Sequence, residues 1–183
     1  MTLTSASSTD QTKTILITGA TGGIGRANAA RFAEEGFNII LLGRSKEKLE
    51  LIYEELEKSN PGKTLIHPFD FTTANGDDYK ILAAAIDEEY PCLDGLIHNA
   101  GLLGTLAPIE HYSEESWEKI MTVNLNAPFR LTKTLLPSLS RSRDARIIFV
   151  SSSVGRAARA FWGAYGVSKF GLEGLMQTLA AEL

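Results

Sequence analysis

Residues 14–25 read TILITGATGGIG, a short apolar run followed by a turn that contains four glycines. A helical pattern starts within this turn and continues to residue 35. A strand, a glycine-rich turn and a helix start, in this order, are typical of a dinucleotide-binding site. The glycines let the backbone approach a pyrophosphate, whose negative charge meets the N–H groups at the helix N-terminus. The alternative is a tight turn between strand and helix that binds no ligand.

Strand and helix patterns alternate along the rest of the chain. Short apolar runs, typical of strands buried on both faces of a parallel sheet, cover residues 13–18, 37–42, 63–69, 93–98 and 146–151. Helical patterns cover residues 23–35, 46–58, 77–90, 114–139 and 162 onward. Repeated βα units predict an α/β fold with a doubly wound parallel sheet, a Rossmann fold of three α/β/α layers.

Composition limits the classes of function. The chain has 183 residues, of which 44% are hydrophobic, and a formal net charge of −4. We expect a mobile polar tail at 1–12 and one domain at 13–183. The mild acidity argues against a nucleic-acid partner, and no apolar run is long enough to span a membrane. The single cysteine and the polar start of the chain predict a cytoplasmic protein, and no histidine has partners that suggest a metal site.

A second motif, YGVSK at residues 165–169, places a phenol and an ammonium group four residues apart, on one face of a helix. A free tyrosine has a pKa of about 10, and a neighbouring cation favours the phenolate, which would suit Tyr165 to proton transfer near neutral pH. A serine hydroxyl from the strand end at 151–153 could hold the oxygen of a carbonyl or alcohol. A tyrosine and a lysine four residues apart often occur by chance, so this spacing alone does not identify a catalytic site. The alternative for Tyr165 is an ordinary aromatic residue at a helix start.

Together these motifs resemble the short-chain dehydrogenase/reductase family over residues 13–183. The glycine turn fits patterns of both the compact and the extended branch, but HNAG at residues 98–101 resembles the N-N-A-G motif of the compact branch, with His98 replacing the first asparagine. The segments 93–104 and 151–170 look most like the bacterial YciK-like oxidoreductases. In such proteins two further strands and a substrate-covering loop follow, so we expect a sheet without its last strands.

The resemblance implies an oxidoreductase that transfers hydride between a nicotinamide and a carbonyl/alcohol substrate. Tyr165 would be the general acid/base, and Ser152, three residues before Gly155, would orient the substrate oxygen. Lys169 would lower the pKa of Tyr165 and hold the nicotinamide ribose. Asn124 would serve the proton relay through its backbone carbonyl.

Pro128 follows Asn124 by four residues and has no N–H to donate to that carbonyl. We therefore expect Pro128 to leave the Asn124 oxygen free for the relay. The alternative is a kink without functional consequence.

The end of the second predicted strand bears on the choice of cofactor. NAD-preferring sites carry an acidic residue there, whereas this chain has Arg44, which can form charge-assisted bonds to a 2′-phosphate. We predict NADP(H) in preference to NAD(H). Ser45 either adds a hydroxyl or caps the next helix. The predicted cofactor site comprises Gly19, Thr21, Gly23, Ile24, Gly25, Gly43, Arg44, Ser45, Asp70, Phe71, Asn99, Ala100, Gly101, Tyr165 and Lys169.

Other possibilities remain open. The alternative function is a non-catalytic dinucleotide-binding sensor or a truncated, inactive member of the family. A serine hydrolase is disfavoured, because no G-x-S-x-G turn surrounds Ser152. Arg156 and Arg159 either attract an acidic substrate or are solvated loop charges. The resemblance also implies a homodimer or homotetramer formed through the helices at 114–139 and 162–183.

Overall fold

The computed structural model describes residues 12–183, so the predicted mobile tail lies, apart from Thr12, outside the described residues. Five parallel strands form one sheet in the order β3-β2-β1-β4-β5. They are β1 (Thr14–Thr18), β2 (Asn38–Gly43), β3 (Thr64–Pro68), β4 (Gly95–His98) and β5 (Arg146–Phe149). The main helices are α1 (Gly23–Glu34), α2 (Lys46–Leu56), α3 (Gly76–Glu89), α4 (Glu114–Met121), α5 (Ala127–Ser140) and α6 (Gly163–Glu182).

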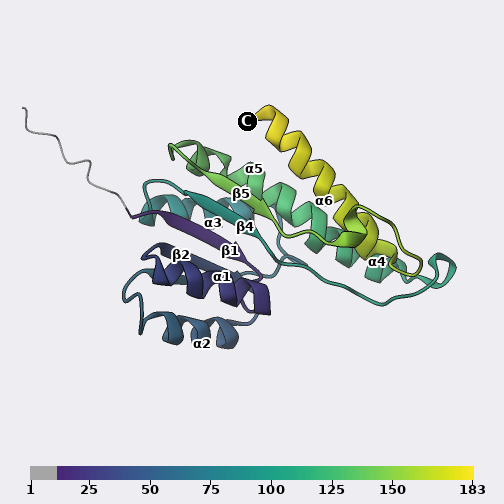
Figure 1. Ribbon diagram of the computed structural model, residues 1–183, viewed down its shortest axis with the longest axis horizontal. Coiled ribbons are helices and arrows are strands. Elements are labelled where there is room, and N and C mark those ends of the chain that lie inside the picture. The colour runs from purple at the N-terminus through teal and green to yellow at the C-terminus, as the bar shows by residue number, and fades with distance from the viewer. Residues whose placement is uncertain (1–11) are drawn as a thin grey trace, which may run out of the picture.

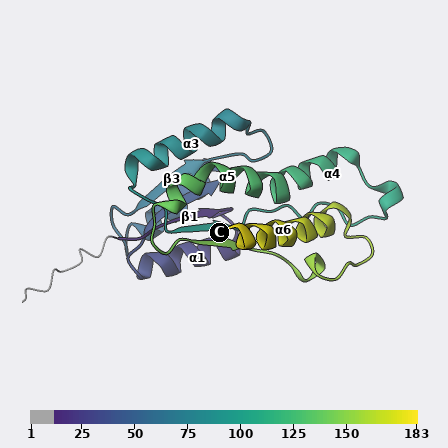
Figure 2. The ribbon, with the colours of Figure 1, turned by 90° about the horizontal axis from the view of Figure 1, so that it is seen from above.

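The helices cover both faces of the sheet, and this confirms the predicted doubly wound α/β fold (Figure 1). Side chains alternate along β1, so that Ile15 and Ile17 pack toward α1 and α2. Leu16, between them, packs toward α3 and α5. Figure 2 shows α3, α5 and α6 running side by side over this second face of the sheet. The strand order reverses between β1 and β4, which is where open α/β sheets bind their ligands.

The two outer strands of the described sheet are less buried than predicted. Residues of β1, β2 and β4 are almost all buried, but β3 is mostly half-buried and β5 alternates between exposed and half-buried positions. Ile148 of β5 is 49% exposed. The expectation of strands buried on both faces is therefore wrong for β3 and β5, because each pairs with one strand only among residues 12–183.

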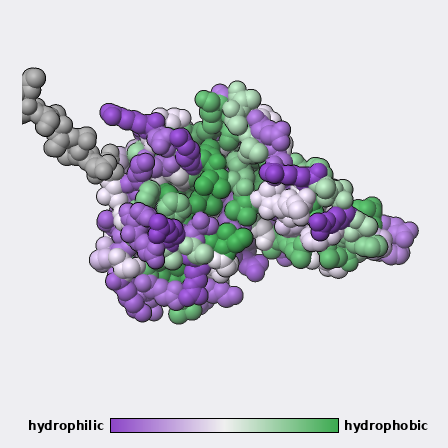
Figure 3. Space-filling view, viewed as in Figure 1, coloured by the Kyte–Doolittle hydropathy of each residue, from purple (hydrophilic) through white to green (hydrophobic). Residues whose placement is uncertain are grey.

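An apolar groove lies beside β5, between α5 and α6. Its volume is about 560 Å³, and Figure 3 shows apolar side chains gathered over β5 and the end of α6. The groove is lined by, among others, Leu136, Leu139, Ile147, Phe149, Met176 and Leu179. No described helix is both long enough and apolar enough to cross a membrane.

The predicted helix at 114–139 is interrupted. Between α4 and α5 lies a π-helical segment, Thr122–Asn126, in which the N–H of Ala127 reaches the carbonyl of Thr122 five residues back. A π-turn of this kind inserts one extra residue and often marks a functional site. The segment ends two residues before Pro128, which has no N–H to donate to the carbonyl of Asn124.

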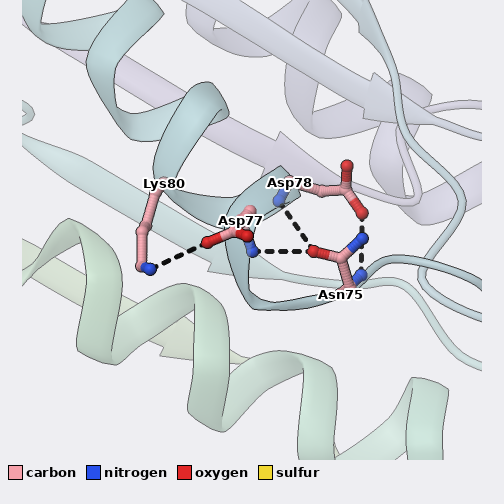
Figure 4. A network of polar contacts seen from close by, with 4 residues as sticks. All are labelled: Asn75, Asp77, Asp78 and Lys80. Atoms are coloured by element: carbon pink, nitrogen blue, oxygen red, sulfur yellow. Dashed lines mark hydrogen bonds and ion pairs between the residues drawn. The ribbon is translucent and has the colours of Figure 1, made fainter.

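A capping box fixes the start of α3 at Gly76, one residue before the predicted start (Figure 4). The side chain of Asn75 accepts bonds from the N–H groups of Asp77 (2.8 Å) and Asp78 (3.4 Å), while the Asp78 carboxylate accepts from the N–H of Asn75 (2.8 Å). Lys80 pairs with Asp77 at 2.8 Å. The Asp77 and Asp78 carboxylates also lie at the positive end of the helix dipole, which stabilises the start of α3. The hydrogen bonds of the capping box hold the loop before α3 in place.

Candidate active site

Two glycines of the first turn are required by the fold itself. Gly19 has φ +61°, and a Cβ there would lie 2.7 Å from the Cα of Ala100. A Cβ on Gly25 would collide with the carbonyl of Gly19 and lie 2.8 Å from the side chain of Asn99. The turn therefore packs directly against the end of β4, and no side chain fits between them.

Gly23 is different, because nothing lies within 4 Å of the position that its Cβ would take. It stands at the first position of α1, where the N–H groups are free of helical partners. The protein gains no packing from a glycine there. The space is what a pyrophosphate needs in order to approach the helix N-terminus, so the residues present fit a bound dinucleotide.

Thr18 and Asn99 tie the turn to β4. The hydroxyl of Thr18 accepts bonds from the N–H groups of Asn99 and Ala100, both at 3.0 Å, and donates to the carbonyl of Ile97 at 3.2 Å. The side-chain amide of Asn99 donates to the carbonyls of Thr18 (3.2 Å) and Gly19 (2.9 Å). Asn99 thus shapes the turn through its side chain. Thr18 was not among the predicted site residues, although its place between strand and glycine is a usable signal.

A cavity of about 180 Å³ opens where the carboxyl ends of β1–β4 meet. Eight of the predicted cofactor residues line it, namely Gly19, Thr21, Gly43, Arg44, Asp70, Phe71, Ala100 and Gly101. Residues that the sequence did not indicate, Phe69, Thr72, Leu102 and Val123, complete the lining. Ile24 is 58% exposed on the first turn of α1 and does not line it.

Polar and charged residues follow β2 and β3 at the edge of this cavity, and hydrogen bonds fix two of them. Burial works to raise the pKa of Asp70, but hydrogen bonds from the hydroxyl (2.7 Å) and N–H (2.9 Å) of Thr72 hold that pKa below its usual value. Ser45 is the N-cap of α2, where its hydroxyl accepts from the N–H of Lys48 (3.3 Å) and donates to Glu47 (2.8 Å). Arg44 is exposed, and no carboxylate among residues 12–183 pairs with it.

The predicted catalytic pair lies on the first turns of α6. Lys169 is 5% exposed, and its Nζ lies 5.8 Å from the centre of the Tyr165 ring. The same Nζ donates to the carbonyl of Val150 at 2.7 Å, and burial lowers the pKa of Lys169. A Cβ on Gly101 would lie 3.8 Å from this Nζ. Lys169 therefore lies beside the loop that follows β4, and residues of this loop line the cavity.

Ser152 follows β5 and begins a single 3-10 turn, Ser153–Gly155. The turn packs closely on α6, since a Cβ on Gly155 would lie 3.0 Å from Lys169. Ser152 lines a cavity of about 350 Å³ together with Arg156 and Glu173. The guanidinium of Arg156 pairs with Glu173 at 3.3 Å, so its charge is balanced within the protein. The Arg156 side chain is 77% exposed, so the structure favours a solvated loop charge over the attraction of an acidic substrate.

Asn124 joins these parts. It is fully buried, and its Oδ1 accepts from the N–H of Leu102 at 2.7 Å. Its Nδ2 donates to the carbonyl of Leu102 at 2.9 Å and to the hydroxyl of Ser168 at 3.0 Å. The side chain of Asn124 therefore connects the π-helical segment, the loop after β4 and α6. Ser168, like Thr18, was not predicted from the sequence.

His98 is a packing residue at the end of β4. It is 3% exposed, its Nε2 lies 2.8 Å from the hydroxyl of Thr132, and its ring stacks on Phe149 with centroids 4.7 Å apart. Burial lowers the pKa of His98 to about 3.

The low pKa of His98 predicts a loss of stability in acid. Between pH 6.5 and about 3 the unfolded chain binds a proton that the folded protein does not, so stability rises with pH in this window and falls on acidification. The slope from this residue approaches about 1.4 kcal/mol per pH unit. Urea unfolding between pH 7 and 4 should show a shallower pH dependence for His98→Asn. The control is His111→Asn, an exposed histidine. Equal slopes for the unaltered protein and His98→Asn would contradict the prediction.

Known proteins match the chain along nearly its whole length. A family model described as short chain dehydrogenase matches residues 13–183. The uncharacterized oxidoreductase YciK of Escherichia coli K12 is 45% identical over 92% of this chain and 67% of its own length. The 3-oxoacyl-[acyl-carrier-protein] reductase FabG of Thermotoga maritima is 34% identical over 93% of this chain and 68% of its own.

Solved structures agree. A short chain dehydrogenase from Escherichia coli CFT073 complexed with NADPH has a TM-score of 0.90 and 45% identity, over 93% of this chain and 71% of that one. The chain spans about two thirds of the length of the two curated relatives. With the parallel sheet, the glycine turn and the tyrosine–lysine helix, these matches show that the chain belongs to the short-chain dehydrogenase/reductase family and is similar to its YciK-like members.

Proposed function

We propose that this protein is an NADP(H)-dependent oxidoreductase that interconverts a carbonyl and an alcohol. One observation carries the proposal: the glycine turn and the tyrosine–lysine pair flank the same loop after β4. Ala100 of that loop packs on Gly19, and Gly101 approaches Lys169. A cofactor bound at the turn would therefore extend toward Tyr165. A similar protein of known structure, complexed with NADPH, supports the choice of a nicotinamide cofactor.

The cofactor, when bound, supplies or accepts the hydride, and the protein supplies placement and the proton. Gly19, Thr21 and Gly23 would hold the pyrophosphate at the start of α1. Gly43, Arg44, Asp70 and Phe71 would hold the adenosine end. The loop Asn99–Gly101 and Lys169 would hold the nicotinamide ribose.

The proton is handled at Tyr165 Oη, which donates it in carbonyl reduction and accepts it in alcohol oxidation. The buried ammonium of Lys169, whose Nζ lies 5.8 Å from the centre of the Tyr165 ring, would place a positive charge beside the reacting oxygens. The hydroxyl of Ser152 would orient the substrate oxygen and stabilise charge that develops on it. The backbone carbonyl of Asn124, which receives no N–H from Pro128, would hold a water that relays protons to Lys169.

Replacement of the phenolic hydroxyl tests this function. Tyr165→Phe keeps the ring that packs near Trp162 but removes the proton donor, so kcat should fall by about 10² to 10⁴ while NADPH affinity is retained. The assay follows NADPH absorbance with a panel of aldehydes, simple ketones and a 3-oxoacyl thioester, the last because one relative is named for 3-oxoacyl reduction. Tyr53→Phe on α2 is the matched control. NADPH binding without turnover of the panel by the unaltered chain would favour the non-catalytic sensor.

The choice of cofactor depends on Arg44. The guanidinium is exposed and forms no salt bridge among the described residues, although its charge helps to lower the pKa of the nearby Asp70, so it can meet a 2′-phosphate. Arg44→Ala should weaken NADPH binding about tenfold or more and leave NADH binding nearly unchanged, because a charge-assisted hydrogen bond contributes about 1.5–3 kcal/mol. Fluorescence titration measures both. Lys46→Ala, two residues further on, is the control. Equal losses for NADPH and NADH would refute the preference.

A homo-oligomer formed through residues 114–139 and 162–183 is also proposed. Apolar side chains on these helices are exposed, with Phe129 50%, Val167 46% and Phe170 44% accessible. Burying them against a second copy would remove apolar surface from water. Light scattering should give a mass of at least twice 19.9 kDa. A mass of one chain at all concentrations would exclude the oligomer. A cytoplasmic location stays a prediction from composition.

A further inference from the structure

We propose that Ser168 is a positioning residue for proton transfer, which fixes the first turn of α6 against Asn124. The inference rests on the proposed function and adds a residue to its machinery. Ser168 is fully buried, and its hydroxyl donates to the carbonyl of Tyr165 at 2.8 Å. The same oxygen accepts from Nδ2 of Asn124 at 3.0 Å. The hydroxyl thus connects the residue that carries the phenol to the π-helical segment.

The direction of every hydrogen bond in this network is determined. A serine hydroxyl has a single proton, and here it points to the Tyr165 carbonyl, so its oxygen is left as an acceptor. Asn124 must then direct its NH₂ toward Ser168 and toward the carbonyl of Leu102, and its oxygen toward the N–H of Leu102. Each side-chain polar atom of Asn124 and Ser168 therefore has a partner, and no two donors or two acceptors face each other. A buried network of this kind specifies one arrangement of its members.

The network connects the two halves of the site. Leu102 follows Gly101, which borders the cavity at the ends of the strands and approaches Lys169. Ser168 lies between Tyr165 and Lys169 on α6. The path Leu102–Asn124–Ser168–Tyr165 therefore sets the position of the phenol relative to the loop on which a nicotinamide would rest. Proton transfer depends steeply on such placement, and a displacement of about 1 Å can lower a rate about 10²-fold.

Removing the hydroxyl should affect proton transfer more than cofactor binding. In Ser168→Ala the bonds between Asn124 and Leu102 remain, but the Tyr165 carbonyl loses its side-chain partner and α6 its connection to Asn124. We expect kcat to fall about tenfold or more. The Kd for NADPH should change less than twofold, because the glycine turn and Arg44 lie outside the network. The solvent deuterium isotope effect on kcat should rise, because proton transfer limits the rate more strongly.

Ser138→Ala is the matched control. Ser138 is also a buried serine, 1% exposed, and its hydroxyl donates to Asp87 at 2.5 Å, on α5 and away from Tyr165. A serine that only stabilises the fold would lower the folded fraction and leave the isotope effect as it was. Ser168→Thr keeps the hydroxyl and should keep the isotope effect of the unaltered protein. If Ser168→Ala does not fold, Ser168→Cys takes its place, because the thiol keeps the size of the side chain but is a weak hydrogen-bond donor and acceptor, and it should raise the isotope effect.

A second readout needs no turnover. Hydrogen–deuterium exchange of the amides in 163–170, without cofactor, should speed up in Ser168→Ala and not in Ser138→Ala. An unchanged isotope effect with unchanged exchange in 163–170 would overturn the inference, as would a raised isotope effect in Ser168→Thr. If the unaltered chain binds NADPH but reduces no substrate, the proposed function fails, and the exchange measurement alone decides whether Ser168 positions α6.

Discussion

The junction between β1 and β4 is the constraint on which the rest of the site depends. The Thr18 hydroxyl accepts two N–H groups from the loop after β4, and the Asn99 amide donates to two carbonyls of the glycine turn. Because Gly19 and Gly25 leave no space for a side chain at this contact, the turn and the loop behave as one rigid unit. The N-terminus of α1 is then presented at the point where the strand order reverses, with room at Gly23 for an anion.

The other half of the site is held by buried polar groups. Lys169 is a buried ammonium group that donates to the carbonyl of Val150, just before the serines that follow β5. Desolvation disfavours its charged form, so the group that it can best serve is an oxygen that gains negative charge nearby. Asn124 and Ser168 hold the helix that carries this lysine against the loop after β4. Pro128 lacks the N–H that a regular α-helix would offer to the carbonyl of Asn124, and the π-segment Thr122–Asn126 lies directly before this part of the helix.

The described surface is uneven in character. The groove beside β5, between α5 and α6, is lined mainly by apolar side chains and is accessible (Figure 3). The predicted cofactor residues line a separate cavity at the carboxyl ends of the strands. His98 lies between the two regions, stacked on Phe149 and bonded to Thr132, and remains neutral because it is buried. Its imidazole fills the end of β4 where the family motif has an asparagine, so packing explains this departure without a catalytic role.

Much of the fold and of the candidate site could be predicted from local sequence patterns. Apolar runs of strand length predicted the five strands and their parallel arrangement. The glycine turn and the HNAG motif predicted four of the residues that line the cavity, the ends of the second and third predicted strands supplied the other four, and the YGVSK motif supplied the pair on α6. These features depend on neighbours within a few positions in the chain. The exposed faces of β3 and β5, the π-segment in the 114–139 helix and the pairing of Arg156 with Glu173 did not follow from local pattern. Neither did the roles of Thr18 and Ser168, whose hydroxyls bond to groups 79 to 82 and 44 residues away in the chain. Burial and long-range hydrogen bonds exist only once the chain has folded, because they depend on which segments the sheet brings side by side.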